Sequence, residues 1–434
     1  MVRQRVGLFV SGSRSREIHR QQGLLRPYAP LLVVGVHFVL AIAYNLTTPF
    51  GNNGYANTPD ESAHFQYVAY VAHHWRLPIF EGYEGVGYEA HQPPLYYFLA
   101  GLAYHLVGGE GKGVRLFSTL CSAGVVWLAW LTARRLFPDN VWIGLSAMAL
   151  VAFLPMHLAI GSAVGNDSLT NLLFAWVLYA FAVPPKTSAP VDGVRFGVLL
   201  GLALLTKATA LILIPLVAMG LALRYKGALK QMAGAIGLTG LTASALAGWW
   251  FVRNALLYDA PLLQKTFLSV FAGTAKAQDF FAQGVSGWEY ARLVADWTFR
   301  SFWFAYGTPQ TARIGLPNFL PDSVYWGLMA WCVLAGVGLI RHGRQQKIKG
   351  ASWESQWFIL GAVLIGLVLV SFVLFVRVFF QAQGRYFYPA LVPIALFLVR
   401  GWDGLFPPSL RAWAHVFLKG LWFLLAVGCW RYLT

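Results

Sequence analysis

The 434-residue chain is 57% hydrophobic and only 12% charged, and its formal net charge is +16. Soluble domains contain about 25% charged residues, so this composition excludes a string of soluble domains and indicates an integral membrane protein. The mean hydropathy of +0.56 agrees. An excess of lysine and arginine is typical of cytoplasmic loops, and the sequence offers no soluble basic domain to bind nucleic acid.

The N-terminal residues 1–27 are basic and polar, and the first apolar segment follows them. The Ala-Ile-Ala run at 41–43 resembles a signal-peptidase site, but a basic cytoplasmic tail explains the same arginines. We therefore expect an uncleaved first helix. Three cysteines lie inside apolar runs without metal-ligand spacing and are expected to be small core residues: Cys121, Cys332 and Cys429.

Apolar windows that suit membrane spans, each needing about 20 residues, recur along the chain. The predicted spans are residues 28–46, 114–132, 141–160, 168–183, 195–206, 208–223, 232–251, 323–340, 356–380, 386–399 and 412–430. Eleven spans place the N-terminus in the cytoplasm and the C-terminus outside, because this arrangement collects most arginine and lysine clusters on one side. The expected fold is an all-α bundle that forms a single domain over residues 28–434.

Two long segments lie on the outer side in this arrangement. The first, residues 47–113, contains the apolar run 93–109, which is expected to form a helix on the membrane surface with tyrosines in the headgroup layer. If that run crossed the membrane, most basic clusters would move to the outer side. The second segment, residues 252–322, contains an aromatic stretch at 297–304 that could form another surface helix.

The first outer segment contains "NTPDESAHFQY" at residues 57–67. Pro59 can start a helix, on which Asp60 and His64 share one face. Asp60 and Glu61 then lie in the first turn, where the helix dipole favours anions, so helix electrostatics alone could explain them. Their position at a membrane surface, beside an aromatic segment, favours a catalytic role for Asp60, with Glu61 and His64 positioning or tuning it.

Polar side chains also mark the outer ends of several predicted spans. Asn166 and Asp167 suit either a helix cap or a functional site. Lys207 interrupts two apolar runs, which points to a function unless the side chain snorkels to the surface. Arg253 and Arg385 are flanked by aromatics, and arginine suits a phosphate because its planar fork donates two hydrogen bonds, although lipid phosphates are an alternative partner.

Six motifs follow one another along the chain: "TPDESAHFQY", "HQPPLYYFLA", "GNDSLTNLL", "LLTKATAL", "WWFVRNALLYDAPL" and "QGRYFYPALVPIAL". This ordered set resembles the GT-C superfamily of membrane glycosyltransferases, and more closely the branch with protein O-mannosyltransferases and lipid A aminoarabinose transferases. The resemblance implies a helical bundle, a polyprenyl-phosphate sugar as donor, and a catalytic acid in the first outer loop. That acid corresponds to Asp60, followed by Glu61, and a second functional acid corresponds to Asp167.

The sequence departs from the aminoarabinose transferases at Gln92, where they carry a lysine near the donor phosphate. Another cation must then neutralise the phosphate, and the candidates are Arg385, Arg253, Lys207, Arg76 and protonated His91. The full set of candidate site residues divides into two groups. The catalytic group is Asp60, Glu61 and His64; the group that binds substrate or donor phosphate is Arg76, His91, Gln92, Tyr96, Asn166, Asp167, Lys207, Arg253, Arg385 and Tyr386.

The expected activity is transfer of a sugar, with inversion, to a hydroxyl of a protein, glycan, lipid or cell-wall polymer at the outer face of a bacterial inner membrane. No cofactor is required, while a divalent cation (Mg²⁺ or Mn²⁺) held by Asp60 and Asp167 is left open. The expected partners are the lipid-linked donor, that acceptor and membrane lipids, without nucleic acid. A transporter or flippase using Lys207 and Asp167 is the main alternative, although the sequence lacks the internal repeat that transporters often show. A silent scaffold that binds lipid-linked sugars is a third interpretation.

Overall fold

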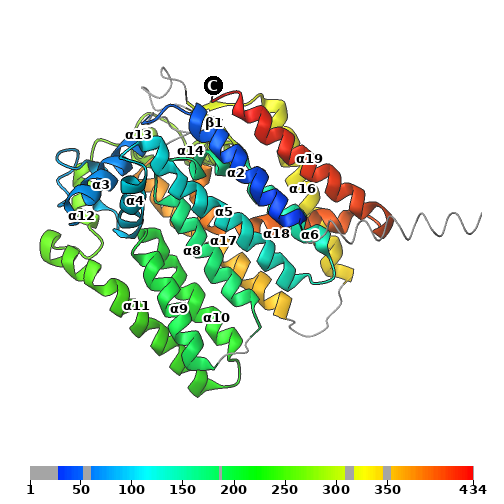
Figure 1. The fold of residues 1–434 in the computed structure, drawn as a ribbon. Helices are drawn as coiled ribbons and strands as arrows, with labels where there is room; N and C mark the ends of the chain where they lie inside the picture. Colours follow the sequence, from blue (N-terminus) through cyan, green and yellow to red (C-terminus); the bar gives the residue numbers. More distant parts are fainter. Residues whose placement is uncertain (1–27, 52–59, 185–187, 308–316, 346–352, 434) are drawn as a thin grey trace, which may run out of the picture.

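The structure, a computed structural model, describes residues 28–51, 60–184, 188–307, 317–345 and 353–433 (Figure 1). In these ranges it is a bundle of helices with one short antiparallel pair of strands, β1 (Ala305–Tyr306) and β2 (Asn318–Phe319). The expected basic tail, residues 1–27, lies outside the described residues. The three cysteines are free, and Cys121 and Cys429 are buried as expected.

A helix occupies every predicted span. These helices are α2 (Ala29–Thr47), α5 (Gly111–Leu136), α6 (Val141–Phe153) with α7 (Pro155–Gly161), α8 (Asp167–Ala182), α9 (Ala189–Leu204), α10 (Leu213–Arg224), α11 (Leu229–Tyr258), α16 (Asp322–Gln345), α17 (Trp353–Val378), α18 (Leu391–Leu405) and α19 (Pro408–Trp430). In the described part of the chain, six helices are long and apolar enough to cross a membrane, or seven if the bent pair α6–α7 is one span. The all-α membrane fold is confirmed, whereas the number of eleven spans and their orientation stay predictions.

Shorter helices make up the two segments that were assigned to the outer side. They are α3 (Glu61–His74), η1 (Tyr88–His91), α4 (Leu95–Leu106), α12 (Gln264–Val270), α13 (Ala277–Ala282) and α14 (Gly287–Trp303), and η2 (Ala208–Ile212) and η3 (Gly384–Ala390) precede α10 and α18. Helices α3, α4 and α12 gather at one end of the bundle (Figure 1).

The expected headgroup tyrosines of α4 need a correction. Tyr96 and Tyr97 are fully buried, because α4 packs its face against α3 and α5, and only Tyr104 lies near the surface. Likewise, Trp303 and Phe304 at the end of α14 are buried in the core. These rings therefore hold α4 and the end of α14 on the bundle, where they are buried in the protein.

Helix α6 lies in the centre of the bundle, and every residue from Ile143 to Phe153 is buried. It ends there because Pro155 lacks an N–H and excludes a helical Leu154, so the chain bends by 59° into α7. Two buried histidines donate hydrogen bonds to backbone carbonyl oxygens at this break. Nδ1 of His157 donates to Val151 O at 2.8 Å, and Nδ1 of His37 donates to Ala152 O at 2.7 Å. Their rings complete the hydrogen bonding that the proline removes from an apolar core.

Helices α9 and α11 lie side by side (Figure 1) and pack through small residues. Gly193, Gly197 and Gly201 repeat at every fourth position of α9 and face α11. A Cβ at Gly197 would lie 2.8 Å from the backbone oxygen of Thr239, closer than a side chain permits. Such ridges of small residues let helices approach closely in lipid, where van der Waals packing is the main source of helix association.

Helices α16 and α18 cross at a pair of glycines, which gives a stability prediction. A Cβ at Gly401 would lie 1.9 Å from the backbone oxygen of Ala335. That oxygen is fixed by its helix, so we expect Gly401→Ala to lower the thermal unfolding midpoint in detergent, because overpacking costs about 1–3 kcal/mol. Gly336→Ala on α16 is the matched control, since its Cβ would meet nothing within 4 Å. Equal midpoints for the two variants would contradict the close crossing.

Candidate active site

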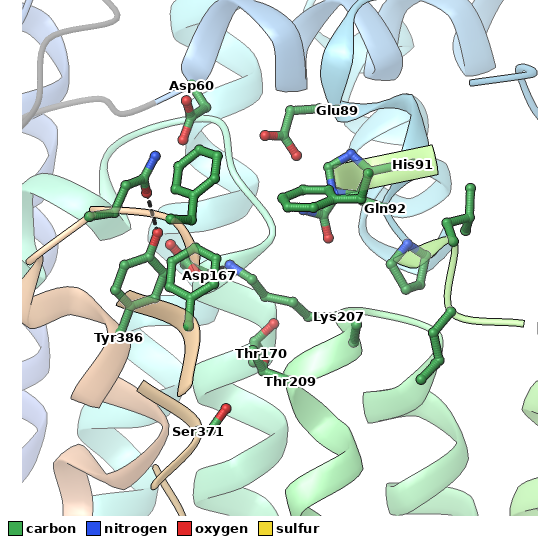
Figure 2. Close-up of a pocket in the computed structure, with 18 of the residues that line it drawn as sticks. Asp60, Glu89, His91, Gln92, Asp167, Thr170, Lys207, Thr209, Ser371 and Tyr386 are labelled. Atoms are coloured by element: carbon green, nitrogen blue, oxygen red, sulfur yellow. Dashed lines mark hydrogen bonds and ion pairs between the residues drawn. The ribbon is translucent and has the colours of Figure 1, made fainter. Parts of the chain in front are cut away.

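A cavity of about 810 Å³ lies among η1, the start of α8, η2, α12, α17 and η3 (Figure 2). Part of its wall is aromatic, and the rings contact one another: centroids of Phe267, Phe271 and Phe375 lie 6.0, 5.7 and 5.4 Å from that of Phe379. The polar part of the wall contains Asp60, His64, Glu89, His91, Gln92, Asp167, Lys207, Arg385 and Tyr386. A pocket with both kinds of lining suits an amphipathic ligand that carries an anionic group.

Asp60 stands just before α3 with a left-handed backbone, φ 62°. Non-glycine residues in that region are uncommon, and such conformations cluster at functional sites. The carboxylate makes no cap bond to α3; it accepts hydrogen bonds from Tyr88 Oη at 2.9 Å and from Arg385 Nη2 at 3.2 Å. The side chain of Asp60 is therefore held by Tyr88 and Arg385 and not by the backbone N–H groups of α3. The helix begins at Glu61, two residues later than the expected start at Pro59, which lies outside the described residues.

Arg385 joins the two acids that the sequence singled out. Its Nη1 donates to Asp167 Oδ2 at 2.9 Å, while its Nη2 donates to Asp60 Oδ2. Its Nε donates to Gln383 Oε1, so all three donor nitrogens of the side chain are used. Asp167 also pairs with Lys207 Nζ, which gives two carboxylates and two cations in one network.

The capping interpretation fails for Asn166 and Asp167 as well. Asn166 stands at the N-cap of α8 without a side-chain cap bond. Its amide nitrogen donates instead to Gln92 Oε1 at 3.1 Å and to Thr206 O at 3.3 Å. Asn166 thus ties η2 and the segment before α4 to the start of α8, and Gln92 stands where the aminoarabinose transferases carry a lysine.

The two acids do not fit a divalent cation as they stand. The guanidinium of Arg385 is bonded to both, so a metal ion bridging Asp60 and Asp167 would have to displace it. Among the described residues, no group of three or more His, Cys, Asp or Glu is arranged for a metal. No step of the mechanism below runs through a metal, and metal dependence stays untested.

Glu61 is adjacent to Asp60 in sequence but does not line the cavity. Its carboxylate is fully buried and accepts from Arg115 Nε at 2.7 Å and Arg115 Nη2 at 2.6 Å. The backbone N–H groups of Val164 and Gly51 donate to it at 2.9 and 3.1 Å. Glu61 therefore anchors the start of α3 to α5 and to the turn before α8. Arg115 was missed, although an arginine inside an apolar window is the signal that could have found it.

The structure separates the predicted site residues into two sets. Eight line the cavity, namely Asp60, His64, His91, Gln92, Asp167, Lys207, Arg385 and Tyr386, and five do not, namely Glu61, Arg76, Tyr96, Asn166 and Arg253. Arg76 is exposed and donates to Tyr70 Oη at 3.0 Å, and Arg253 donates to Pro78 O at 2.7 Å. The hydroxyl of Tyr96 bonds Ser118 and accepts from Gly165 N.

The cavity residues without a predicted role include three polar ones that matter for the site: Tyr88, Glu89 and Gln383. Tyr88 and Gln383 bond Asp60 and Arg385, as described above. His91 is also corrected as a candidate cation, because burial lowers the pKa of its imidazole to about 4 and the ring is neutral near pH 7. Lys207 and Arg385 then remain as the cations at the cavity wall among the described residues.

The family model described as dolichyl-phosphate-mannose-protein mannosyltransferase matches residues 91–250. The match includes Gln92, Asp167 and Lys207, and it covers less than half of the chain. No curated protein matches the chain in sequence.

Solved structures share the fold. The apo oligosaccharyltransferase of Archaeoglobus fulgidus matches 94% of this chain with 14% identity and a TM-score of 0.56. The same organism's AglB, in complex with an inhibitory peptide and a dolichol-phosphate, matches 94% with 12% identity and a TM-score of 0.51. The chain covers 55% and 56% of those two proteins. ArnT from Cupriavidus metallidurans, in the apo state, matches 86% of this chain and 78% of its own, with 16% identity, but its TM-score of 0.42 is too low to support a conclusion.

The resemblance to the GT-C superfamily is therefore confirmed. The chain has the helical membrane fold of these glycosyltransferases, and the family match supports a transferase of the GT-C type.

Proposed function

We propose that the protein transfers a sugar from a polyprenyl-phosphate donor to an acceptor hydroxyl at the outer face of a bacterial inner membrane. The observation that carries this proposal is Arg385, which bridges Asp60 and Asp167 in a cavity that also has an aromatic wall. The Archaeoglobus fulgidus protein that was solved with a dolichol-phosphate supports it, because the two chains share a fold. The acceptor is a protein, glycan, lipid or cell-wall polymer.

The cavity lining suggests how such a donor would bind. The isoprenoid would lie along the phenylalanine wall, and its phosphate would approach Arg385 and Lys207. The phosphate would compete with Asp60 and Asp167 for these cations. Asp60 would then lose its hydrogen bond from Arg385 and keep the one from Tyr88 Oη, which makes its carboxylate a better proton acceptor while still fixing its position.

The reaction would be a single displacement. The acceptor oxygen attacks the anomeric carbon, the bond from that carbon to the phosphate oxygen breaks, and its electron pair stays on the phosphate. Asp60 takes the proton of the acceptor hydroxyl, or orients that hydroxyl, and Arg385 and Lys207 stabilise the charge that develops on the leaving phosphate. One displacement inverts the anomeric centre.

Replacing Arg385 tests the proposal. We expect Arg385→Ala to lower the turnover of radiolabelled polyprenyl-phosphate sugars by about 10²–10³-fold, because loss of one preorganised donor to a developing charge has an effect of this size. The matched control is Arg253→Ala, since Arg253 lies outside the cavity and bonds Pro78 O. Equal turnover of the two variants, at comparable thermal stability, would refute the assignment of Arg385 to the leaving phosphate.

A further inference from the structure

Glu89 presents a carboxyl oxygen without a partner to the cavity. The residue lies on η1 and is 6% exposed, and its Oε2 is buried without a hydrogen bond. Figure 2 shows this carboxyl group in the upper part of the cavity, between Asp60 and His91 and facing the side that holds Lys207. Buried polar atoms nearly always have a partner, so an orphan oxygen at a cavity wall marks a place for a ligand atom.

His64, the neighbouring histidine, is not a hydrogen-bond partner of this Glu89 oxygen. Nδ1 of His64 lies 3.8 Å from Glu89 Oε2, too far for a hydrogen bond, and bonds Tyr97 Oη at 2.8 Å. Burial raises the pKa of Glu89 and lowers the pKa of His64. Both shifts favour the uncharged forms of the pair, and a protonated Glu89 carboxyl group would offer both an O–H donor and a carbonyl acceptor.

The charges of the other lining residues agree with a neutral Glu89. Among the described cavity residues, the carboxylates of Asp60 and Asp167 stand against the cations of Lys207 and Arg385. His64 and His91 are neutral because they are buried. An ionised Glu89 would leave an excess negative charge in the pocket and would repel an anionic phosphate, whereas the neutral acid leaves two carboxylates against two cations.

The position of Glu89 favours the sugar over the lipid. The sugar is bonded directly to the phosphate, so its ring must lie next to Arg385 and Lys207, on the side where Asp60 can reach the reacting centre. Glu89 lies near Asp60 and Lys207 in Figure 2, and the rings of Tyr83 and Tyr88, whose centroids are 5.5 Å apart, also line the cavity. The phenylalanine wall, by contrast, has no hydrogen-bonding side-chain atoms to offer a sugar.

We propose that Glu89 binds a hydroxyl group of the transferred sugar through this unpartnered carboxyl oxygen and so selects sugars that carry a hydroxyl group at that position. This assignment rests on the proposed function and adds a specificity-determining residue to it. A site built to hydrogen-bond a substrate hydroxyl discriminates strongly against analogues that lack it, because its own polar group is then left unpaired.

Two variants and two ligands test the assignment. Glu89→Gln keeps a neutral donor and acceptor, whereas Glu89→Ala removes both. Binding of a sugar-free polyprenyl phosphate and of polyprenyl-phosphate hexoses would be measured for wild type and both variants, together with kcat and KM for each donor that wild type uses. We expect all three proteins to bind the sugar-free lipid equally. We expect Glu89→Ala to bind the best hexose donor at least about tenfold more weakly and Glu89→Gln to stay close to wild type.

The outcomes are distinguishable. Equal weakening of both lipids by Glu89→Ala would show a structural role and overturn the assignment, as would unchanged hexose binding or a Glu89→Gln variant as impaired as Glu89→Ala. In each of those cases wild type still transfers sugar, so the proposed function stands. If wild type neither binds nor uses any polyprenyl-phosphate sugar, the proposed function fails and the role of Glu89 fails with it.

Discussion

Asp60→Asn is expected to abolish sugar transfer and to leave the fold intact. Asparagine has the same size and can still accept from Tyr88 Oη, but it cannot take a proton and it loses the ion pair with Arg385. Proton transfer by a positioned side chain contributes about 10²–10⁴-fold to the rate, so turnover should fall by at least that range. Initial rates with radiolabelled donors measure the effect, and thermal unfolding in detergent checks the fold.

The control for this variant is Asp139→Asn. Asp139 is exposed and lies outside the cavity lining, so its loss of charge should change neither turnover nor stability. If purified Asp60→Asn turned over as fast as this control, the assignment of Asp60 as base or orienting group would be wrong. A loss of turnover together with a large loss of stability would instead point to a structural role for its contacts with Tyr88 and Arg385.

Replacing Glu61, the acid next to Asp60, is expected to lower the stability of the protein, whereas Asp60→Asn leaves the fold intact. Glu61 and Arg115 are both fully buried, and Arg115 Nη1 also donates to Asn45 O at 2.7 Å and Thr48 O at 2.9 Å. Removing one partner of a buried pair leaves an uncompensated charge and costs about 3–5 kcal/mol. We therefore expect Arg115→Met to lower the free energy of unfolding by about that amount, and Glu61→Gln to lower it in the same direction.

A double-mutant cycle separates the pair from its surroundings. In the double variant Glu61→Gln with Arg115→Met no charge is left unpaired, so its destabilisation should be smaller than the sum of the single effects. Denaturant unfolding in detergent measures the loss of unfolding free energy for the two single variants and the double variant. A Glu61→Gln protein that is as stable as wild type but inactive would contradict the anchoring role and return Glu61 to the chemistry.

The sequence predicted the helices well because their signal is local. Each apolar window of about the right length contains a helix, since a polypeptide in lipid must satisfy its backbone hydrogen bonds within the segment. The burial of Tyr96 and Tyr97 was not predicted, because amphipathic rings suit both a membrane interface and a packed helix contact. Only the packing of α4 on α3 and α5 decides between the two.

The candidate site was predicted in part for a similar reason. Asp60, Asp167, Lys207 and Arg385 were recognised as chemically suitable, and all four line one cavity. The sequence could not separate Arg253 from Arg385, because both are flanked by aromatic residues at the end of a predicted span. Their partners, Pro78 O and the two carboxylates, come from distant parts of the chain that only the fold brings together.

Glu61 and Glu89 illustrate the same limit. Glu61 is next to Asp60 in sequence, yet its side chain pairs with Arg115 and does not line the cavity. Glu89 is far from Asp60 in sequence and lies in the same cavity wall. Proximity in the chain was therefore a poor guide to membership of the site. The left-handed backbone of Asp60, just before the first residue of α3, separates its side chain from that of Glu61.

Sugar transfer by the wild-type protein is the most direct test of the account. The purified protein, reconstituted in proteoliposomes, would be given radiolabelled polyprenyl-phosphate sugars and membrane extract. The account predicts that label leaves the lipid and appears on an acceptor, and that free polyprenyl phosphate is released. Accumulation of the substrate in the vesicles without label transfer, as a transporter or flippase would give, or binding of the donor without any turnover, would contradict it.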